Sequence, residues 1–509
     1  MLLTSNAWTG AKLLATKYCS VISFLLILTA CGDSGDSEEL TPTNNSPTAN
    51  AGIEQMVEEN TLVTLTGMGN DSDGSIASYS WLQTGGTTVT LVSPDSASAS
   101  FTSPRVLTSI SISFELTVID NEGLTATDSV DVIINPVGTI IHVPADFLTI
   151  GAAINSAAPG DKVLLNTGIH TEISTIIIDK DLTIASAFIY TQKQSDILST
   201  IILGDGLNNL FTVTSGANVK IEGLTIENTG KPITIDVGQG IIRHNLLRDH
   251  KDDAISFEGD SSGVAEFNVI IGSGDDGIDI DGLRGPYTIR ENIILDSGDD
   301  GMEFRMINSY LVTGKIKYEV YNNIINGTGG DGIQLIDYPA DNQNLREINI
   351  HNNYIKNARF AGVGTMPDTI TGRTQLSEIY PNFDFMERVF VTNNTLTNND
   401  NGISGGDNFI VLNNIIVDNR LGVTNLDGTS ILDYTMFFNN NSSGLPSFVQ
   451  GNNIIFDDPI LNSDGSLNYL SPGIDAGASS YTWKNEIVLD IKTLNSPKPD
   501  LGWVEFIGS

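Results

Sequence analysis

Asn292-Ile-Ile-Leu-Asp-Ser-Gly-Asp-Asp-Gly301-Met-Glu-Phe-Arg305 is one copy of a phrase that recurs along the middle of the chain. Two further clear copies begin at Asn268 and Asn323, and in all three copies a glycine follows nine residues after the asparagine. Weaker copies begin at Asn245, Asn353, Asn394 and Asn414, and successive copies start 20 to 41 residues apart. A phrase repeated at such intervals is typical of a solenoid, in which each short repeat buries its apolar face against the next repeat.

The residue pattern inside each copy favours strands over helices. Two short β-branched runs are separated by Gly, Asn and Asp, and no apolar period of helix length is present. Strands that stack on their own copies must be parallel, so we expect an all-β chain in which residues 137–509 form a right-handed parallel β-helix. Because side chains alternate along a strand, Ile278 and Ile280 should face the core, and Asp279 and Asp281 should face outward. The repeated asparagines should stack as a buried hydrogen-bonded ladder.

Acidic residues recur at the glycine end of each copy. They form the pairs Asp252-Asp253, Asp275-Asp276 and Asp299-Asp300, followed by a single Asp331. Stacked repeats would bring these carboxylates to about one strand spacing, ~4.8 Å, where like charges repel. Unless some of them are protonated, a cation should lie among them. Ca²⁺ prefers hard oxygen ligands in a flexible geometry. We therefore predict a Ca²⁺ site formed by Asp252, Asp275, Asp276 and Asp279.

The beginning of the chain has the pattern of an export signal. Lys12 and Lys17 precede an apolar run, Val21–Leu28, that is too short to span a bilayer. The run leads into Leu-Thr-Ala-Cys31, which resembles the signal of a bacterial lipoprotein, where the cysteine becomes the lipidated first residue. The resemblance implies a signal peptide over 1–30, lipidation of Cys31 and a lipid anchor in the bacterial cell envelope, at the surface of the outer membrane. A secreted protein is the alternative location. An ordinary secretory signal is the alternative.

Two further segments separate the signal from the repeats. Residues 31–46 are rich in Gly, Ser, Asp and Glu and should form a disordered tether. Residues 47–136 contain short alternating runs divided by turn residues, which favours a β-sandwich. This unit resembles PKD-type Ig-like domains through Pro47–Gly52, Asp71–Trp81 and Val118–Gly123. The resemblance implies a spacer or a weak glycan-binding domain.

The chain is strongly acidic. Its 509 residues contain 62 Asp and Glu against 25 Lys and Arg, a formal charge of −37, and removing 1–30, with two Lys and no acid, gives −37 − 2 = −39. This charge argues against nucleic acid or an anionic membrane surface as a direct partner, and it favours divalent cations. The expected membrane contact is through the N-terminal lipid only, and a monomer is expected.

The acidic stretch resembles family 9 polysaccharide lyases, β-helix enzymes of the pectate-lyase type. The resembling residues are Asp252, Asp275-Asp276-Gly-Ile-Asp279 and Gly285–Ile289. The resemblance implies that the acids bind Ca²⁺, that the ion holds a uronate carboxylate, and that a lysine of the next coil removes the C5 proton in a β-elimination. In this chain Glu303 occupies the lysine position. The remaining candidates for catalysis beside Glu303 are Arg305, Lys315 and Lys317. Lys315 or Lys317 is the preferred base, because a lysine next to Ca²⁺ loses its proton more readily, although the pleat places Arg305 better.

The sequence therefore favours a surface lipoprotein that acts on polysaccharide, most simply by Ca²⁺-dependent β-elimination of a uronate-containing glycan. Two alternatives stay open. One is a non-catalytic carbohydrate-binding or adhesive surface protein. The other is a glycoside hydrolase with paired carboxylates drawn from Asp276, Asp279, Asp300 and Glu303.

Overall fold

The computed structural model describes residues 43–307, 315–337, 346–367, 385, 387–444, 451–491 and 498–505. The expected signal peptide, Cys31 and most of the expected tether lie outside the described residues. In the described part of the chain, no helix has both the length and the apolar character needed to cross a membrane.

The first unit is a β-sandwich. Its strands are β1 Thr48–Asn50, β2 Gln55–Glu58, β3 Leu62–Thr66, β4 Met68–Asn70, β5 Ile76–Gly85, β6 Ser98–Thr102, β7 Ile110–Asp120 and β8 Thr125–Asn135. The largest sheet has the order β2-β8-β7-β5, and strict alternation along β7 places every second side chain in the core. Trp81, Phe101 and Phe114 are buried there, and the two phenylalanine rings are 5.0 Å apart.

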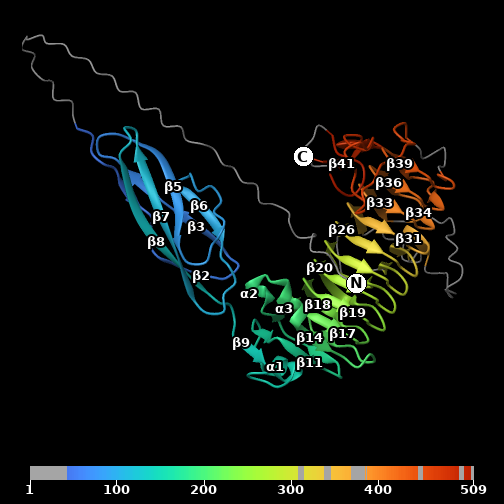
Figure 1. The fold of residues 1–509 in the computed structure, drawn as a ribbon, viewed down its shortest axis with the longest axis horizontal. Coiled ribbons are helices and arrows are strands. Elements are labelled where there is room, and N and C mark those ends of the chain that lie inside the picture. The colour runs from blue at the N-terminus through green and yellow to red at the C-terminus, as the bar shows by residue number, and fades with distance from the viewer. Residues whose placement is uncertain are drawn as a thin grey trace, which may run out of the picture.

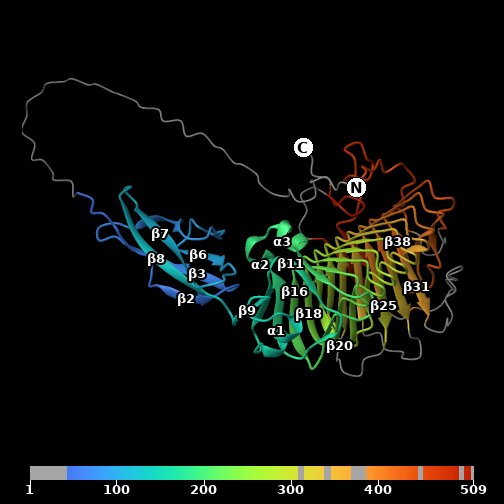
Figure 2. The same cartoon turned by 60° about the horizontal axis from the view of Figure 1, so that its bottom comes forward.

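The remainder is the right-handed parallel β-helix that the repeats predict, and Figures 1 and 2 show its stacked coils beside the sandwich. Each coil has three faces, and each face pairs in parallel with the same face of the next coil. The strands of the first face are β12 Ile176–Ile178, β15 Phe211–Val213, β22 Ile278–Ile280, β25 Met302–Met306, β28 Ile333–Asp337, β31 Ala361–Pro367, β34 Asn401–Ser404 and β37 Leu421–Thr424.

The second face continues from the first around a bend. Its strands are β9 Ile140–Val143, β10 Lys162–Leu165, β13 Leu182–Ser186, β16 Ala217–Glu222, β23 Tyr287–Arg290, β26 Ile316–Tyr321, β29 Arg346–His351, β32 Arg388–Thr392, β35 Phe409–Leu412 and β38 Ile431–Asp433. In two coils one long strand, β18 Ile233–Arg243 or β20 Ile255–Glu266, supplies both faces, since each pairs with neighbours on both.

The third face completes the coil. Its strands are β11 Gly168–Thr171, β14 Thr200–Leu203, β17 Thr225–Glu227, β19 Leu246–Arg248, β21 Val269–Ile271, β24 Ile293–Leu295, β27 Ile324–Asn326, β30 Tyr354–Lys356, β33 Thr395–Thr397, β36 Ile415–Val417 and β39 Met436–Phe438. The helix α1 Ile150–Ser156 packs beside β9 and β10 at the first coil, and the antiparallel hairpin of β40 Ser480–Trp483 and β41 Glu486–Asp490 packs on the second face near the last coils.

The sequence did not predict the helices α2 Phe188–Thr191 and α3 Gln194–Ser199, which interrupt the coil between β13 and β14. The insertion carries no copy of the repeated phrase, so periodicity gives no signal for it. Phe188 and Ile189 of α2 are buried, so this helix packs against the coil and does not project from it.

The core confirms the predicted alternation. Ile278, Ile280, Met302 and Phe304 are fully buried in one continuous apolar core that extends along the β-helix. The intervening Asp279 and Glu303 belong to the opposite, outer side of the sheet, yet they are only 3% and 0% exposed. The pleat therefore predicts the direction of these side chains but not their burial.

The asparagine ladder is confirmed at the corner between the second and third faces. From Asn268 onward, each buried asparagine accepts two hydrogen bonds at Oδ1, from the backbone N and the Nδ2 of the asparagine one coil earlier, at 2.9–3.1 Å. In the first member, Asn245, Oδ1 accepts from Leu224 N at 3.1 Å. The same contacts continue to the last copy. The ladder members are Asn245, Asn268, Asn292, Asn323, Asn353, Asn394 and Asn414.

Candidate functional site

The acid doublets lie at the corner between the third and first faces, and the second residue of each doublet forms a buried inner column. The pairing of the strands that follow places Asp253, Asp276, Asp300 and Asp331 at equivalent positions of successive coils. Each Oδ1 accepts a hydrogen bond from the backbone N of the next coil: Asp276 N to Asp253 at 3.1 Å, Asp300 N to Asp276 at 2.8 Å, and Asp331 N to Asp300 at 2.5 Å. The inner column therefore holds the turns together.

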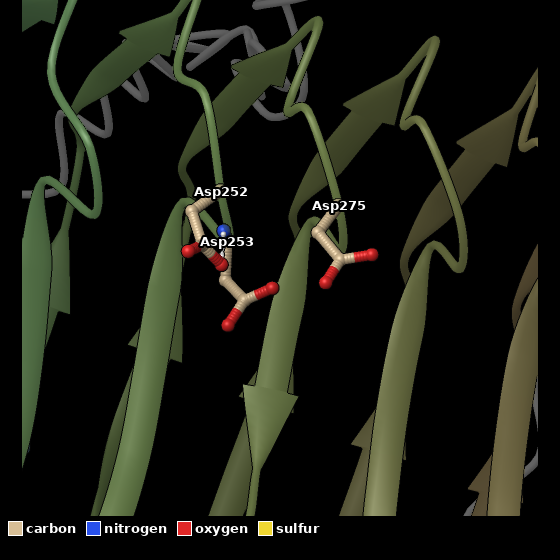
Figure 3. A group of neighbouring side chains, drawn as sticks. All are labelled: Asp252, Asp253 and Asp275. Carbon is tan, nitrogen blue, oxygen red and sulfur yellow. Dashed lines mark hydrogen bonds between the residues drawn. The ribbon is translucent and has the colours of Figure 1, made fainter. Parts of the chain in front are cut away.

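The first residue of each doublet forms an outer column that reaches solvent. Asp275 is exposed, and Asp252 and Asp299 are half-buried. Figure 3 shows Asp252 and Asp253 beside Asp275, which lies at the corresponding place on the next coil. One carboxylate oxygen from each of these three residues lies within 4.8 Å of the others. The same is true of Asp275, Asp276 and Asp299, so the outer column offers oxygen ligands at successive steps.

A third acidic group continues onto the first face. Asp276, Asp279 and Glu303 bring carboxylate oxygens within 4.8 Å of one another, and all three residues are buried. Burial, followed by repulsion from Glu303 and Asp253, raises the pKa of Asp276 well above its ordinary value. Burial and the neighbouring Asp281 do the same to the pKa of Asp279. Within the described residues, Asp279 Oδ1 is buried without a hydrogen-bond partner.

Arg305 provides a cation at this acidic face. Its guanidinium forms an ion pair with Glu303, lies 2.6 Å from Asp281 and lies 3.9 Å from Asp279. Although partial burial opposes the charged form, Glu303, Asp279 and Asp281 raise the pKa of Arg305, so the guanidinium stays protonated. The acids that Arg305 contacts lie on the first face beside the doublets, so a cation among the doublets themselves stays a prediction.

A second cation lies one coil before the acid doublets, and sequence reasoning missed it. Lys231 Nζ is 2.9 Å from Asp253 and 3.1 Å from Glu258. Lys231 lies two residues before β18, just as Asp253 lies two residues before β20. Lys231 therefore occupies the first position of the inner column. The register of the repeats could have placed it there.

The two lysines considered as bases lie on another face. Lys317 belongs to β26 on the second face, where its Nζ is 3.3 Å from Glu347, and the exposed Lys315 immediately precedes this strand. Among the described contacts, no ion pair or hydrogen bond joins either lysine to the acid columns. Arg305 is therefore the candidate base that contacts the acidic face.

The four predicted Ca²⁺ ligands are distributed over the three overlapping groups. The first group joins Asp252 and Asp275 with Asp253. The second joins Asp275 and Asp276 with Asp299, and the third joins Asp276 and Asp279 with Glu303. The structure thus adds Asp253, Asp299 and Glu303 as neighbouring oxygen donors. A single ion held by Asp252, Asp275, Asp276 and Asp279 stays a prediction.

A separate charged cluster lies near the corner between the first and second faces. Arg346 is 1% exposed, and it donates from Nε to Tyr318 Oη at 3.0 Å and from Nη2 to the carbonyl of Ile307. Its Nη1 lies 3.6 Å from Glu387. Burial and the nearby Asp337 raise the pKa of Glu387 to about 7, although Arg346 acts against this. Because this cluster joins residues from separate coils, repeat spacing gave no signal for it.

Comparisons with known proteins bear mainly on the first unit. Residues 51–134 match a family model that describes a PKD domain. A solved PKD domain from the KIAA 1837 protein is 31% identical, and the match covers 21% of this chain and 93% of that chain with a TM-score of 0.16. No curated protein matched the chain.

Two solved structures align with longer parts of the chain at low identity. The A-module of the Azotobacter vinelandii mannuronan C-5 epimerase AlgE4 is 16% identical, with 63% of this chain and 98% of that chain covered and a TM-score of 0.38. A PL6-family alginate lyase, a mutant of AlyGC, is 14% identical, with 73% of this chain and 59% of that chain covered and a TM-score of 0.34.

Proposed function

Since the chain carries a PKD domain at residues 51–134 joined to a parallel β-helix, we propose that it acts on a uronate-containing polysaccharide by Ca²⁺-dependent β-elimination on the first face of the helix. The observation that carries the proposal is the contact between stacked carboxylates and a single arginine. Arg305 forms ion pairs with Glu303 and Asp281 and lies 3.9 Å from Asp279, and Glu303 and Asp279 form one carboxylate group with Asp276.

The acid columns suit a hard divalent cation. They offer carboxylate oxygens within 4.8 Å of one another, and Asp279 Oδ1 is buried without a hydrogen-bond partner among the described residues. Such a group of like charges is stable only if some of its members are protonated or a cation binds. A bound Ca²⁺ would supply positive charge to the uronate carboxylate and so make the neighbouring C5 proton more acidic.

Arg305 is proposed as the base. For this role Arg305 must first lose a proton to solvent. The C5 proton then passes to a nitrogen of the neutral guanidine, the C–H electron pair forms the C4–C5 double bond, and the C4–O4 bond breaks as the departing oxygen takes a proton from solvent. While Asp279, Asp281 and Glu303 are charged they oppose loss of the arginine proton, and a cation bound at the acids offsets this field. We therefore expect turnover to require Ca²⁺ and to rise with pH.

The test is formation of unsaturated sugar ends from a panel of uronate polysaccharides, followed by their ultraviolet absorbance with and without Ca²⁺. Arg305→Ala should remove activity, whereas Arg284→Ala should keep it, because Arg284 makes a comparable ion pair with Asp260 away from the acid columns. Lys315→Ala and Lys317→Ala should also retain activity. Full activity in Arg305→Ala together with loss of activity in either lysine variant would indicate that the base is that lysine, on the second face.

Glycoside hydrolysis is the second candidate. It is favoured by the raised pKa values of Asp276 and Asp279, which burial causes, because a carboxyl group that stays protonated can act as a general acid. Hydrolysis gives new reducing ends without ultraviolet absorbance, so the same incubations separate the two reactions. Binding of glycan without either product would indicate the third candidate, a non-catalytic carbohydrate-binding surface protein.

The proposed location follows from the sequence of the N-terminal segment. We propose that the chain is anchored in the bacterial envelope through a lipid on Cys31, with the PKD domain holding the β-helix away from the membrane. Metabolic labelling with a fatty-acid analogue should modify the wild-type protein and not Cys31→Ser. Equal labelling of both proteins, or labelling of neither, would count against the anchor.

A further inference from the structure

A cavity of about 290 Å³ lies between the PKD domain and the first coils of the β-helix, outside the acidic site. The PKD domain contributes Glu59, Asn60 and Arg105 to its wall, and the second face of the helix contributes Lys162, Thr183 and Lys220. The three residues from the helix form one column, since Lys162 pairs with Thr183 and Thr183 pairs with Lys220 in successive strands. The volume is close to the lower limit of small-molecule sites, ~300 Å³.

Most charges at this cavity are already neutralised within the protein. Lys162 forms an ion pair with Glu59 and donates to the Val137 carbonyl at 2.6 Å. Arg105 is 2.7 Å from Glu222, which also lies 3.0 Å from Arg243. These contacts hold the two domains together and fix the walls of the cavity.

Lys220 differs from these residues. It is exposed at the cavity, and no ion pair or hydrogen bond to its side chain occurs among the described residues. Partial desolvation, together with repulsion from Arg105 and Arg243, lowers the pKa of Lys220. In a chain with a formal charge of −37, this concentration of basic groups around one lysine is unusual. An anion placed in the cavity would relieve the repulsion.

The remaining surface of the cavity suits a small amphipathic ligand. Leu182 and Ile189 supply apolar wall, and Thr183, Asn218 and Asp181 supply polar groups. The Asp181 carboxylate is engaged by Asn218, whose backbone N and Nδ2 donate to Asp181 Oδ1 at 2.7 and 3.2 Å. Beside Ile189 in α2, the hydroxyl of Tyr190 is buried without a hydrogen-bond partner among the described residues. Tyr190 is close enough to Glu59 and Arg105 for both charges to act on its pKa, which desolvation raises to about 12.

We propose that this cavity between the domains binds a single carboxylate-bearing sugar unit, with Lys220 as the partner of the carboxylate. The assignment to a uronate rests on the proposed substrate class, whereas the site itself is separate from the acid columns. The cavity would give the protein a second point of attachment to an acidic glycan, at the junction that fixes the PKD domain to the helix.

The test is calorimetric titration of the full chain with sodium galacturonate in the presence of a chelator, so that Ca²⁺-dependent binding at the acid columns does not contribute. Galacturonate should bind and neutral galactose should bind far more weakly. Lys220→Met should weaken galacturonate binding by roughly tenfold or more, as expected for loss of a charge-assisted contact, and Lys220→Arg should retain most of it. Lys484→Met, which removes an exposed lysine of the C-terminal hairpin, is the matched control.

The outcomes separate this inference from the proposed reaction. Binding that persists in Asp276→Asn with Asp279→Asn but is lost in Lys220→Met supports the cavity even if no unsaturated product ever forms. Equal binding of galactose and galacturonate, equal binding by wild type and Lys220→Met, or binding of inorganic phosphate without galacturonate would each overturn it.

Discussion

Two corners of the central coils carry stacked side chains, asparagine at one corner and aspartate at the other. These two side chains have nearly the same size and differ in one atom. At the corner between the second and third faces each asparagine both accepts and donates, so that Asn268 receives two hydrogen bonds from Asn245 and gives two to Asn292. At the corner between the third and first faces an ionised aspartate can only accept. Asp276 Oδ1 accepts the backbone N of Asp300, but neighbouring aspartates cannot donate to one another.

The asparagine column is structural, whereas the aspartate column is suited to a ligand. The amide ladder satisfies its own polar groups, so it stabilises the stack without any additional molecule. The carboxylate ladder satisfies the backbone but concentrates charge that only protons, arginine, lysine or a metal ion can compensate. Exchanging the two side-chain types at equivalent corners is therefore the sharpest test of this difference.

The largest effect is expected from a carboxylate in the amide ladder. Asn292 is fully buried and donates Nδ2 to the Ala265 carbonyl at 2.8 Å and to Asn323 Oδ1 at 3.0 Å. Asn292→Asp removes both donors and turns a charged oxygen toward two acceptors, so it should lower the free energy of unfolding by about 3–5 kcal/mol. Chemical denaturation measures this change, and a loss below that of an ordinary surface substitution would contradict the ladder's role.

The next effect concerns calcium at the carboxylate corner. If the acids bind Ca²⁺, the ion should raise the stability of the native state by about 2.7 kcal/mol at a concentration a hundredfold above its Kd. Asp276→Asn with Asp279→Asn should abolish the rise in Tm that Ca²⁺ causes, while both proteins fold without the ion. Differential scanning calorimetry with Ca²⁺ or chelator measures this. A wild-type Tm that Ca²⁺ does not change would leave the column as a turn ladder only.

The amino-acid sequence was sufficient for the features that repeat. The positions of Asn292 and Ile278 follow from a phrase copied in every coil, and the register of Asp276 with Asp300 follows from the same copies. Repetition works because parallel stacking converts equal spacing in sequence into contact in space. The direction of Glu303 could be predicted from the pleat, but its complete burial could not.

Features that join different coils or different domains could not be predicted in this way. The contact of Arg346 with Glu387 connects residues on either side of a long insertion, and the ion pair of Arg105 with Glu222 depends on how the PKD domain packs on the helix. Neither contact has a periodic signal. Arg305 is intermediate, because its strand position was evident but its three carboxylate partners depend on side-chain conformation.

The remaining corner, between the first and second faces, provides a pH-dependent contrast. Glu387 has a pKa raised to about 7 by burial and by Asp337, above the ordinary value of 4.5. The folded state therefore binds the proton more tightly than the unfolded state, so this contribution to stability is complete below pH 4.5 and is lost as pH rises toward 7. The loss should be on the order of 2 kcal/mol and should disappear in Glu387→Gln, as measured by urea unfolding at pH 5 and pH 7.5. An unchanged pH profile in that variant would assign the dependence to other groups.

The smallest effect is expected where an amide is placed in the carboxylate ladder. Asp300 is fully buried, and Asp276 and Asp331 lie on either side of it in the inner column, so its charge is opposed by burial and by like charges. In Asp300→Asn the Oδ1 atom can still accept the backbone N of Asp331, which lies 2.5 Å away, while the repulsion is removed. The variant should therefore be more stable than wild type by about 1 kcal/mol in the presence of a chelator, the opposite sign to Asn292→Asp. Asp299→Asn, in the solvent-accessible outer column, should change stability by less than about 0.5 kcal/mol and is the matched control. Chemical denaturation of the three proteins in chelator decides the matter, because a destabilised Asp300→Asn would show that the carboxylate itself, and not merely an acceptor oxygen, is needed to hold this corner together.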